Sequence, residues 1–285
     1  MYPRATWRRL LSPPADGPLN MAVDEAILLA VAEGQAPPTL RFFAWSPPCL
    51  SLGYAQPLEE VDLGRLRARG WDLVRRPTGG RAILHTDELT YSVIAPMDEP
   101  RVVGGVVESY RQLSAGLLRG LELLGLAAQA EKKRGPNPQT PIPGPQPLPV
   151  CFEVPSDYEI TAGGRKLLGS AQVRKKGVVL QHGTLPLTGD LARICEALRF
   201  ESEAERERVR ARVRSRAATV AEALGVAVTW DQAAAALGRG FEEALNLELL
   251  PGDLSGLEND HARRLRAEKY GTDAWNARVM AAASP

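Results

Sequence analysis

Apolar residues recur every three or four positions in several stretches, the spacing that places side chains on one face of a helix. The first stretch begins at Asn20, which we expect to be the N-cap, and Gly34 ends it. The strongest stretch is 106–124, and Gly125 follows it directly. Further helices are predicted at 190–199, 202–214, 231–245 and 257–280, with a capping box at Thr219–Glu222 starting a short one.

Short apolar runs separated by proline and glycine indicate strands between these helices. They lie at 40–45, 49–54, 72–77, 81–85 and 89–95, and the last alternates like a partly buried strand. Residues 158–187 read as a hairpin-rich sheet with turns at Gly163–Gly164 and Lys176–Gly177. Strands and helices do not alternate regularly. The pattern therefore predicts an α+β fold, with a mixed or antiparallel sheet flanked by helices.

One segment fits neither pattern. Seven of the fourteen residues from Pro136 to Pro149 are proline, which excludes a helix or an interior strand. We predict an exposed loop of polyproline character over 135–149. An insertion without a role would have the same composition, and both interpretations stay open.

Composition narrows the class of protein. The 285 residues suit one large domain with at most a small appendage, and 44% hydrophobic with 24% charged residues is ordinary for a globular protein. The net charge of +1 argues against a nucleic-acid binder. No secretory signal or membrane-spanning run is visible, so we expect no membrane partner. Three cysteines fit free thiols in a reducing cytoplasm.

The segment from Arg75 to Arg81 is the first candidate for chemistry. Adjacent glycines allow close approach of a backbone to a ligand, and flanking arginines suit a carboxylate, a phosphate or an acidic partner. A glycine turn with solvated arginines would look the same, so the pattern alone does not decide. The candidate binding residues here are Arg75, Arg76, Thr78, Gly79, Gly80, Arg81 and, nearby, His85.

Lys166 and Cys151 are the second and third candidates. Lys166 lies in a predicted strand between small residues, where spacing alone favours a surface lysine at a strand edge. A lone cysteine between apolar neighbours is usually a small buried hydrophobe. A cysteine near a lysine would instead have a lowered pKa and be reactive. We expect Cys49 and Cys195 to be structural. The histidines lack metal-ligand spacing, so no zinc site is predicted.

Taken in order, these segments resemble the superfamily of lipoate-protein ligases, octanoyltransferases and biotin ligases. The resemblance covers most of the chain and is carried by Leu19–Glu25, Ser51–Tyr54, Arg75–Ala82 with His85, Glu88–Ser92, Cys151–Phe152, Pro155–Glu159, Gly164–Gln172, Leu180–Gly183 and Lys269–Gly271. The chain is most similar to the LipM-type octanoyltransferases. Those enzymes have a cysteine where Cys151 falls, and Arg81 stands where ATP-dependent ligases carry a third small residue.

The resemblance implies a catalytic domain of the biotin and lipoyl ligase type over 1–255 and a helical tail over 256–285 packed on it. It implies that Cys151 accepts the octanoyl group from octanoyl-acyl carrier protein and passes it to a lysine of a lipoyl-domain protein such as the glycine cleavage H protein. Lys166 would assist Cys151. The resemblance adds Gly169, Ser170, Ala171 and His182 to the substrate-binding residues.

A thioester donor is already activated, so the resemblance implies no cofactor. The nearest alternative is an ATP-dependent lipoate or octanoate ligase, which would need ATP and Mg²⁺ but not Cys151. An alternative of another class is a non-catalytic module that binds carrier proteins, against which the presence of Cys151 and Lys166 argues. Basic runs at 132–134 and 174–176 are candidate docking sites for an acidic carrier protein, or simply solvated turns.

Overall fold

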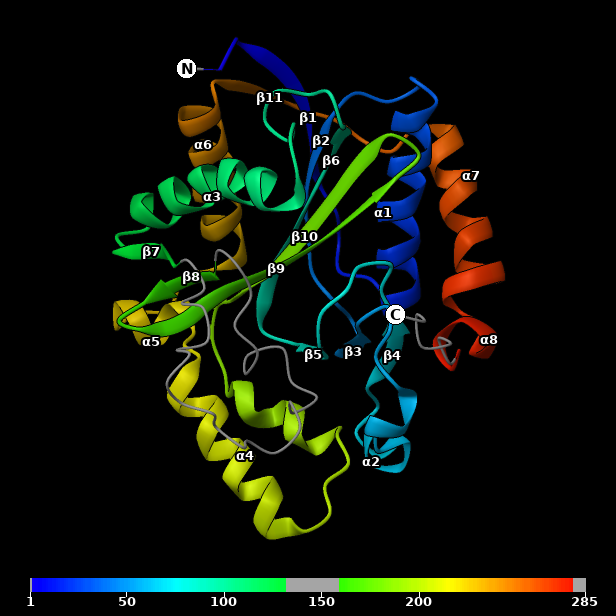
Figure 1. Ribbon diagram of the computed structural model, residues 1–285, viewed down its shortest axis with the longest axis vertical. Coiled ribbons are helices and arrows are strands. Elements are labelled where there is room, and N and C mark those ends of the chain that lie inside the picture. Colours follow the sequence, from blue (N-terminus) through cyan, green and yellow to red (C-terminus); the bar gives the residue numbers. More distant parts are fainter. Residues whose placement is uncertain (1, 132–158, 279–285) are drawn as a thin grey trace.

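The computed structural model describes residues 2–131 and 159–278, so Cys151, the loop 135–149 and the basic run 132–134 lie outside the described residues. Most strands belong to one large sheet, which runs through the middle of the molecule (Figure 1). Its strands are β1 (Ala5–Leu11), β2 (Thr39–Phe43), β6 (Glu88–Pro96), β7 (Ala128–Glu131), β8 (Glu159–Ala162), β9 (Arg165–Lys175), β10 (Val178–Pro186) and β11 (Leu247–Pro251).

The strand order in the large sheet is β11-β1-β2-β6-β10-β9-β8-β7. Strand β1 pairs in parallel with both β11 and β2, whereas the pairs from β2 to β7 are antiparallel. The predicted mixed sheet is therefore confirmed. The two predicted turns of the hairpins are also found, because Gly163, Gly164, Lys176 and Gly177 all have positive φ.

A smaller sheet carries the residues around the glycine pair. It consists of β4 (Asp72–Arg75), β3 (Cys49–Leu52) and β5 (Ile83–His85), with β3 in the centre. Its outer side packs on α2 (Leu63–Ala68), a 3-10 helix at Leu191–Glu196 and α4 (Glu203–Arg216). The helix predicted at 190–199 is shorter than expected and has 3-10 instead of α geometry. The helix predicted at 202–214 is confirmed.

Helices cover both faces of the large sheet (Figure 1). Helices α3 (Val106–Leu123) and α6 (Trp230–Leu245) pack on one face, and α1 (Gly17–Ala32) with α7 (Gly256–Leu265) lies on the other. Strand β6 is consequently buried on both sides: Leu89 and Tyr91 face α3 and α6, while Ile94 faces α1. The alternating pattern predicts only partial burial, whereas the polar residues Thr90 and Ser92 are buried as well.

Helix α1 starts earlier than the sequence predicted. Its N-cap is Asp16, whose carboxylate accepts a hydrogen bond from the amide of Leu19 at 2.7 Å. Pro18 lies in the first turn, where its missing N–H is not needed. Asn20 is a buried residue inside the helix, and its side-chain amide donates to the carbonyls of Ala15 and Ala44 instead. Asn20 therefore ties the helix to the neighbouring chain and does not cap it.

The long helices α3 and α6 match their predictions to within a residue or two. Helix α6 begins with a complete capping box between Thr229 and Gln232. At Thr219 only half of the predicted box forms: Thr219 caps α5 (Val220–Leu224), but the Glu222 carboxylate pairs with Arg165. None of the described helices is long and apolar enough to cross a membrane.

The predicted tail helix is divided into three pieces. Helix α7 continues into a π-helical turn at Arg266–Tyr270, and after Gly271 comes the short α8 (Asp273–Asn276). The tail lies along α1 and reaches the end of β4, so α8 sits beside the small sheet (Figure 1). This path brings residues near 270 next to the segment that carries the glycine pair.

Candidate functional site

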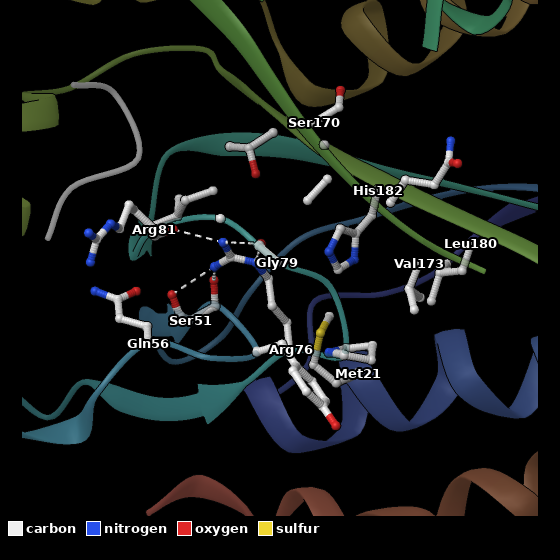
Figure 2. A pocket seen from close by; sticks show the side chains of 18 of the residues that line it. Met21, Ser51, Gln56, Arg76, Gly79, Arg81, Ser170, Val173, Leu180 and His182 are labelled. Carbon is white, nitrogen blue, oxygen red and sulfur yellow. Dashed lines mark hydrogen bonds between the residues drawn. The ribbon is translucent and has the colours of Figure 1, made fainter. Parts of the chain in front are cut away.

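A cavity of about 1070 Å³ lies between α1, the small sheet, strands β9 and β10 and the C-terminal segment. It has two kinds of wall, one of glycine backbone and polar side chains and one of apolar side chains (Figure 2). The sequence candidates that line it are Arg76, Gly79, Gly80, Arg81, His85, Lys166, Gly169, Ser170, Ala171 and His182. Arg75 and Thr78 are buried behind the wall, and Cys151 lies outside the described residues.

Lys166 is not a surface residue. Strand β9 is interior, between β10 and β8, and Lys166 is only 4% exposed. Its ammonium donates a hydrogen bond of 2.6 Å to Oε1 of Glu159, which stands on the neighbouring strand. The structure therefore places a buried cation in the cavity wall, and Glu159 is a partner that sequence analysis did not single out.

A chain of buried polar groups joins α1 to the glycine segment. Thr78 Oγ1 lies 2.6 Å from Nε2 of His182, and Nδ1 of His182 faces Asp24 at 3.5 Å. Burial lowers the pKa of His182, which favours the neutral imidazole. With Nδ1–H directed at Asp24, Nε2 accepts a hydrogen bond from the Thr78 hydroxyl. Burial alone would raise the pKa of Asp24, but the Arg41 guanidinium at 2.7 Å and His182 hold it below its usual range.

A second histidine has the same kind of partners. Nε2 of His85 lies 2.7 Å from the Ser51 hydroxyl, and Nδ1 lies 2.5 Å from the Glu88 carboxylate. The imidazole stacks on Trp45 with ring centroids 3.9 Å apart, which fixes its orientation. His85 is thus held between a hydroxyl and a carboxylate, as His182 is.

The two adjacent arginines shape the site by binding backbone carbonyls. Arg76 donates to the carbonyls of Gly79 and Arg81 and to the Ser51 hydroxyl, which fixes the glycine loop (Figure 2). Arg75 donates to the carbonyls of Gly53, Tyr54, Gln56 and Asn276. Arg75 thus organises the wall of the cavity from behind, away from the space a substrate would occupy.

Glycine is required at two places in this wall. A Cβ on Gly53 would collide with the carbonyl of Gly80, so the two loops touch backbone to backbone. Gly80 also has φ +93°, a left-handed conformation that other residues rarely adopt. Gly79 has nothing within 4 Å of its Cβ position and faces open space.

The apolar wall comes from α1 and from the hairpin. Val173 and Leu180 are direct neighbours across β9 and β10, and Met21 of α1 lines the same cavity (Figure 2). Leu28 of α1 is a further lining residue. A wall of aliphatic side chains suits an aliphatic chain.

An ion-paired cluster around Glu25 also lines the cavity, from α1, the hairpin and the C-terminal segment. Glu25 accepts from Lys175 at 2.9 Å, from the Tyr270 hydroxyl at 2.6 Å and from Lys269. Burial opposes ionisation, but the bonds from Lys269, Tyr270 and Lys175 lower the pKa of Glu25 to about 2. Asp24 and Glu25 were both missed as site residues. Two adjacent carboxylates in an otherwise apolar helix were the available signal.

Metal ligation finds no support in the described part of the chain. Across residues 2–131 and 159–278, no group of three or more His, Cys, Asp or Glu side chains is arranged to hold a metal ion. Cys49 and Cys195 are buried, and burial raises the pKa of Cys49 well above its usual value. Neither thiol has the setting of a nucleophile.

Comparison with known proteins assigns a family to this architecture. The family model described as lipoyl protein ligase A/B catalytic domain matches residues 16–242. Two similar proteins are named octanoyltransferase LipM. The one from Symbiobacterium thermophilum is 47% identical, covering 95% of this chain and 98% of its own. The one from Kyrpidia tusciae is 44% identical, covering 96% and 99%.

A solved structure gives the same answer for the fold. A bi-partite lipoate protein ligase from Thermoplasma acidophilum, described with its E2 lipoyl domain, superposes with a TM-score of 0.81 at 27% identity. The superposition covers 98% of each chain. The predicted lipoate-ligase-like fold is confirmed.

Proposed function

The chain belongs to the family of lipoyl protein ligase A/B catalytic domains, and on that premise we propose how it transfers an octanoyl group. Its relatives at 44–47% identity are named octanoyltransferases, and this chain is an octanoyltransferase of lipoate biosynthesis. Our proposal concerns the route: from octanoyl-acyl carrier protein, through a thioester on Cys151, to a lysine of a lipoyl-domain protein.

The first step exchanges one thioester for another. The Cys151 thiolate attacks the octanoyl carbonyl, a new C–S bond forms, and the pantetheine thiolate leaves and takes up a proton. In the second step the amine of the acceptor lysine attacks the Cys151 thioester. An amide forms, the amine loses a proton, and the Cys151 thiolate is released. Both steps start from an activated acyl group, so the proposal needs no ATP, no metal and no other cofactor.

The observation that carries the proposal is the buried ammonium of Lys166 in the wall of this cavity. A positive charge in a water-poor cavity stabilises both a nearby thiolate and the oxyanion that develops during attack on a carbonyl. Glu159 holds the ammonium in position at 2.6 Å. We assign Lys166 to both tasks and Glu159 to positioning it.

The apolar wall accounts for the choice of acyl group. We place the acyl tail against Met21, Leu28, Val173 and Leu180, which line the cavity. Seven carbons beyond the carbonyl, at about 0.8 kcal/mol each, contribute roughly 5–6 kcal/mol when buried. That is sufficient to prefer octanoyl over short acyl groups by several orders of magnitude.

We propose a lipoyl-domain protein as the acceptor, with the glycine cleavage H protein as the specific candidate. The similar archaeal ligase is described together with its E2 lipoyl domain, which supports an acceptor of this class. The acyl donor is proposed from the chemistry of the thioester. Arg174 and Lys175 are poor candidates for docking it, since Arg174 donates to the carbonyls of Gly104 and Gly105 and Lys175 pairs with Glu25.

Intact-mass measurement tests the covalent step. Incubation with octanoyl-acyl carrier protein, without ATP, should add one octanoyl group to the wild type and none to Cys151→Ala. Cys195→Ala is the matched control, because this thiol is buried away from the cavity, and it should still be acylated. Cys151→Ser should react very slowly, since a hydroxyl is rarely ionised near pH 7.

The same experiment separates the alternatives. ATP-independent transfer by Cys151→Ala at the wild-type rate would refute the thioester route. Transfer from free octanoate that needs ATP and Mg²⁺ and survives in Cys151→Ala would establish the ligase instead. A protein that binds the carrier but transfers nothing would be the non-catalytic module.

A further inference from the structure

Arg278 is held against two aromatic rings that line the cavity. Its guanidinium carbon lies 3.9 Å from the ring centroid of Tyr54 and 3.6 Å from that of Trp275. The two rings are 6.2 Å apart and inclined by 70°, so the cation sits in the angle between them. Contact with both rings restricts the guanidinium and removes part of its hydration.

Part of this guanidinium has no acceptor among the described residues. Nε and Nη2 of Arg278 are buried and have no hydrogen-bond partner among the described residues. No carboxylate in that part of the chain forms an ion pair with Arg278 either. A desolvated cation without acceptors is unfavourable, so a buried guanidinium normally has them. The fixed fork of N–H groups suits a bound oxyanion.

The neighbouring charges do not neutralise it. Burial and the neighbouring charge of Arg278 lower the pKa of Arg75. The hydrogen bonds of Arg75 go to backbone carbonyls, which carry no net charge. Lys269 lies over the Trp275 ring but is already paired with Glu25. Glu59, exposed in the 3-10 helix Leu58–Glu60, is the acidic group that acts on Arg75. Among the described residues, none of these neighbouring charges forms an ion pair with Arg278.

We propose that Arg278, with Tyr54 and Trp275, binds the phosphate of the donor's phosphopantetheine arm. The inference rests on the proposed function, in which the donor is a thioester on that arm. Tyr54 donates its amide to the Thr78 carbonyl and so stands on the glycine loop, and the same cavity extends from Lys166 to Trp275. We place the donor with its acyl carbon near Lys166 and its arm along this loop toward Trp275. The phosphate, the one anionic group of the arm, then meets Arg278.

Two small donors isolate the contribution of the phosphate. Octanoyl-phosphopantetheine and octanoyl-pantetheine differ only in that group, and their kcat/KM for acylation of Cys151 is compared by intact mass. We expect the wild type to favour the phosphorylated donor by ~10-fold or more, mainly through KM, as one charge-assisted bidentate contact would give. In Arg278→Gln the ratio should fall close to 1, and Arg278→Lys should restore part of it.

Arg264→Gln is the control for net charge, because Arg264 is exposed on α7, and it should keep the wild-type ratio. A wild-type ratio near 1, or a ratio unchanged in Arg278→Gln, would overturn the inference. Failure of Cys151 to react with either donor would instead count against the proposed function. Calorimetry with phosphopantetheine and pantetheine on Cys151→Ala then still tests the site, since it needs no turnover. Binding of ATP that is lost in Arg278→Gln, without binding of phosphopantetheine, would assign the site to a nucleotide and refute our ligand.

Discussion

Helices α3 and α6 cover one face of the large sheet, and α1 covers the other, with very different buried residues. The buried residues of α3 and α6 carry no charge. The Ser114 hydroxyl bonds to a carbonyl of its own helix, and that of Ser109 bonds to the carbonyl of Val106 and to the side-chain amide of Gln172. Helix α1 buries Asn20, Asp24 and Glu25 among its apolar residues. Both helical layers hold the fold together, but only the second also builds the site.

The difference shows how a charge is kept inside the protein. Each buried carboxylate of α1 has at least two partners from other segments: Arg41, Ser92 and His182 for Asp24, and Lys175, Lys269 and Tyr270 for Glu25. These partners come from strands, the hairpin and the C-terminal segment. The polar layer therefore also ties in the C-terminal segment around Lys269 and Tyr270, which does not belong to the apolar cluster of α3 and α6.

Removing the charge of Asp24 should have the largest effect on stability. Asp24→Ala leaves the Arg41 guanidinium, 1% exposed, without its counter-charge, and breaking such a buried pair costs about 3–5 kcal/mol. Urea unfolding measures the loss. A double variant, Asp24→Leu with Arg41→Met, removes both charges and should recover much of it. A loss below about 1 kcal/mol in the single variant would show that the pair is not what stabilises this layer.

Glu25→Gln should have the next largest effect on stability, and this effect should depend on pH. The folded pKa of Glu25 is about 2, below its ordinary value of 4.5. Its ionised form therefore stabilises the fold fully above pH 4.5, and this stabilisation is lost as the pH falls toward 2. The difference between wild type and variant should be about 3 kcal/mol near pH 7 and vanish near pH 2.

Urea unfolding at several pH values follows that difference. Glu33→Gln is the matched control, because Glu33 lies exposed at the end of the same helix and has no such partners, and its difference should stay near zero. A pH-independent difference for Glu25→Gln would mean that the loss comes from packing and not from the charge.

Gly240→Ala tests the apolar layer and should have the smallest effect. A Cβ on Gly240 would overlap the backbone of Gly116 and Gly120, so α3 and α6 must move apart, at about 1–3 kcal/mol. Gly256→Ala, with nothing within 4 Å of the new Cβ, should be near neutral. Transfer activity per folded molecule should be retained in both variants. Loss of activity in Gly240→Ala without loss of stability would contradict the claim that only the α1 layer builds the site.

The sequence predicted the elements whose pattern is local. Helices α3 and α6 each present one apolar stripe to a sheet, and the strands from β2 to β6 and from β8 to β10 are bounded by proline or glycine. Strands β1, β7 and β11 were not predicted. The first of these contains Arg8 and Arg9 and obtains its partners from residues 39–42 and 247–251, which no local pattern can indicate.

The site was only partly predictable for the same reason. The glycine and arginine segment was found from its residue types, and the structure brings most of its members to one cavity. The different roles of Arg75 and Arg76 could not be predicted from the sequence. Both mainly bind backbone carbonyls, and because every residue has a carbonyl, no residue type marks these partners. Glu159 was not identified because its contact with Lys166 depends on the pairing of β8 with β9.

The contacts of Arg75 with Asn276 have a consequence for biosynthesis. Asn276 accepts the amide of Arg75 through its side chain and the guanidinium through its carbonyl, across 201 positions of the chain. A ribosome adding 5–20 residues each second reaches Asn276 roughly 10–40 seconds after Arg75. Throughout that interval Arg75, which begins the glycine segment, lacks its contacts with Asn276. The cavity therefore closes late in synthesis, and a shorter translation product that stops before Asn276 would fold its sheet but leave the rim of the site open.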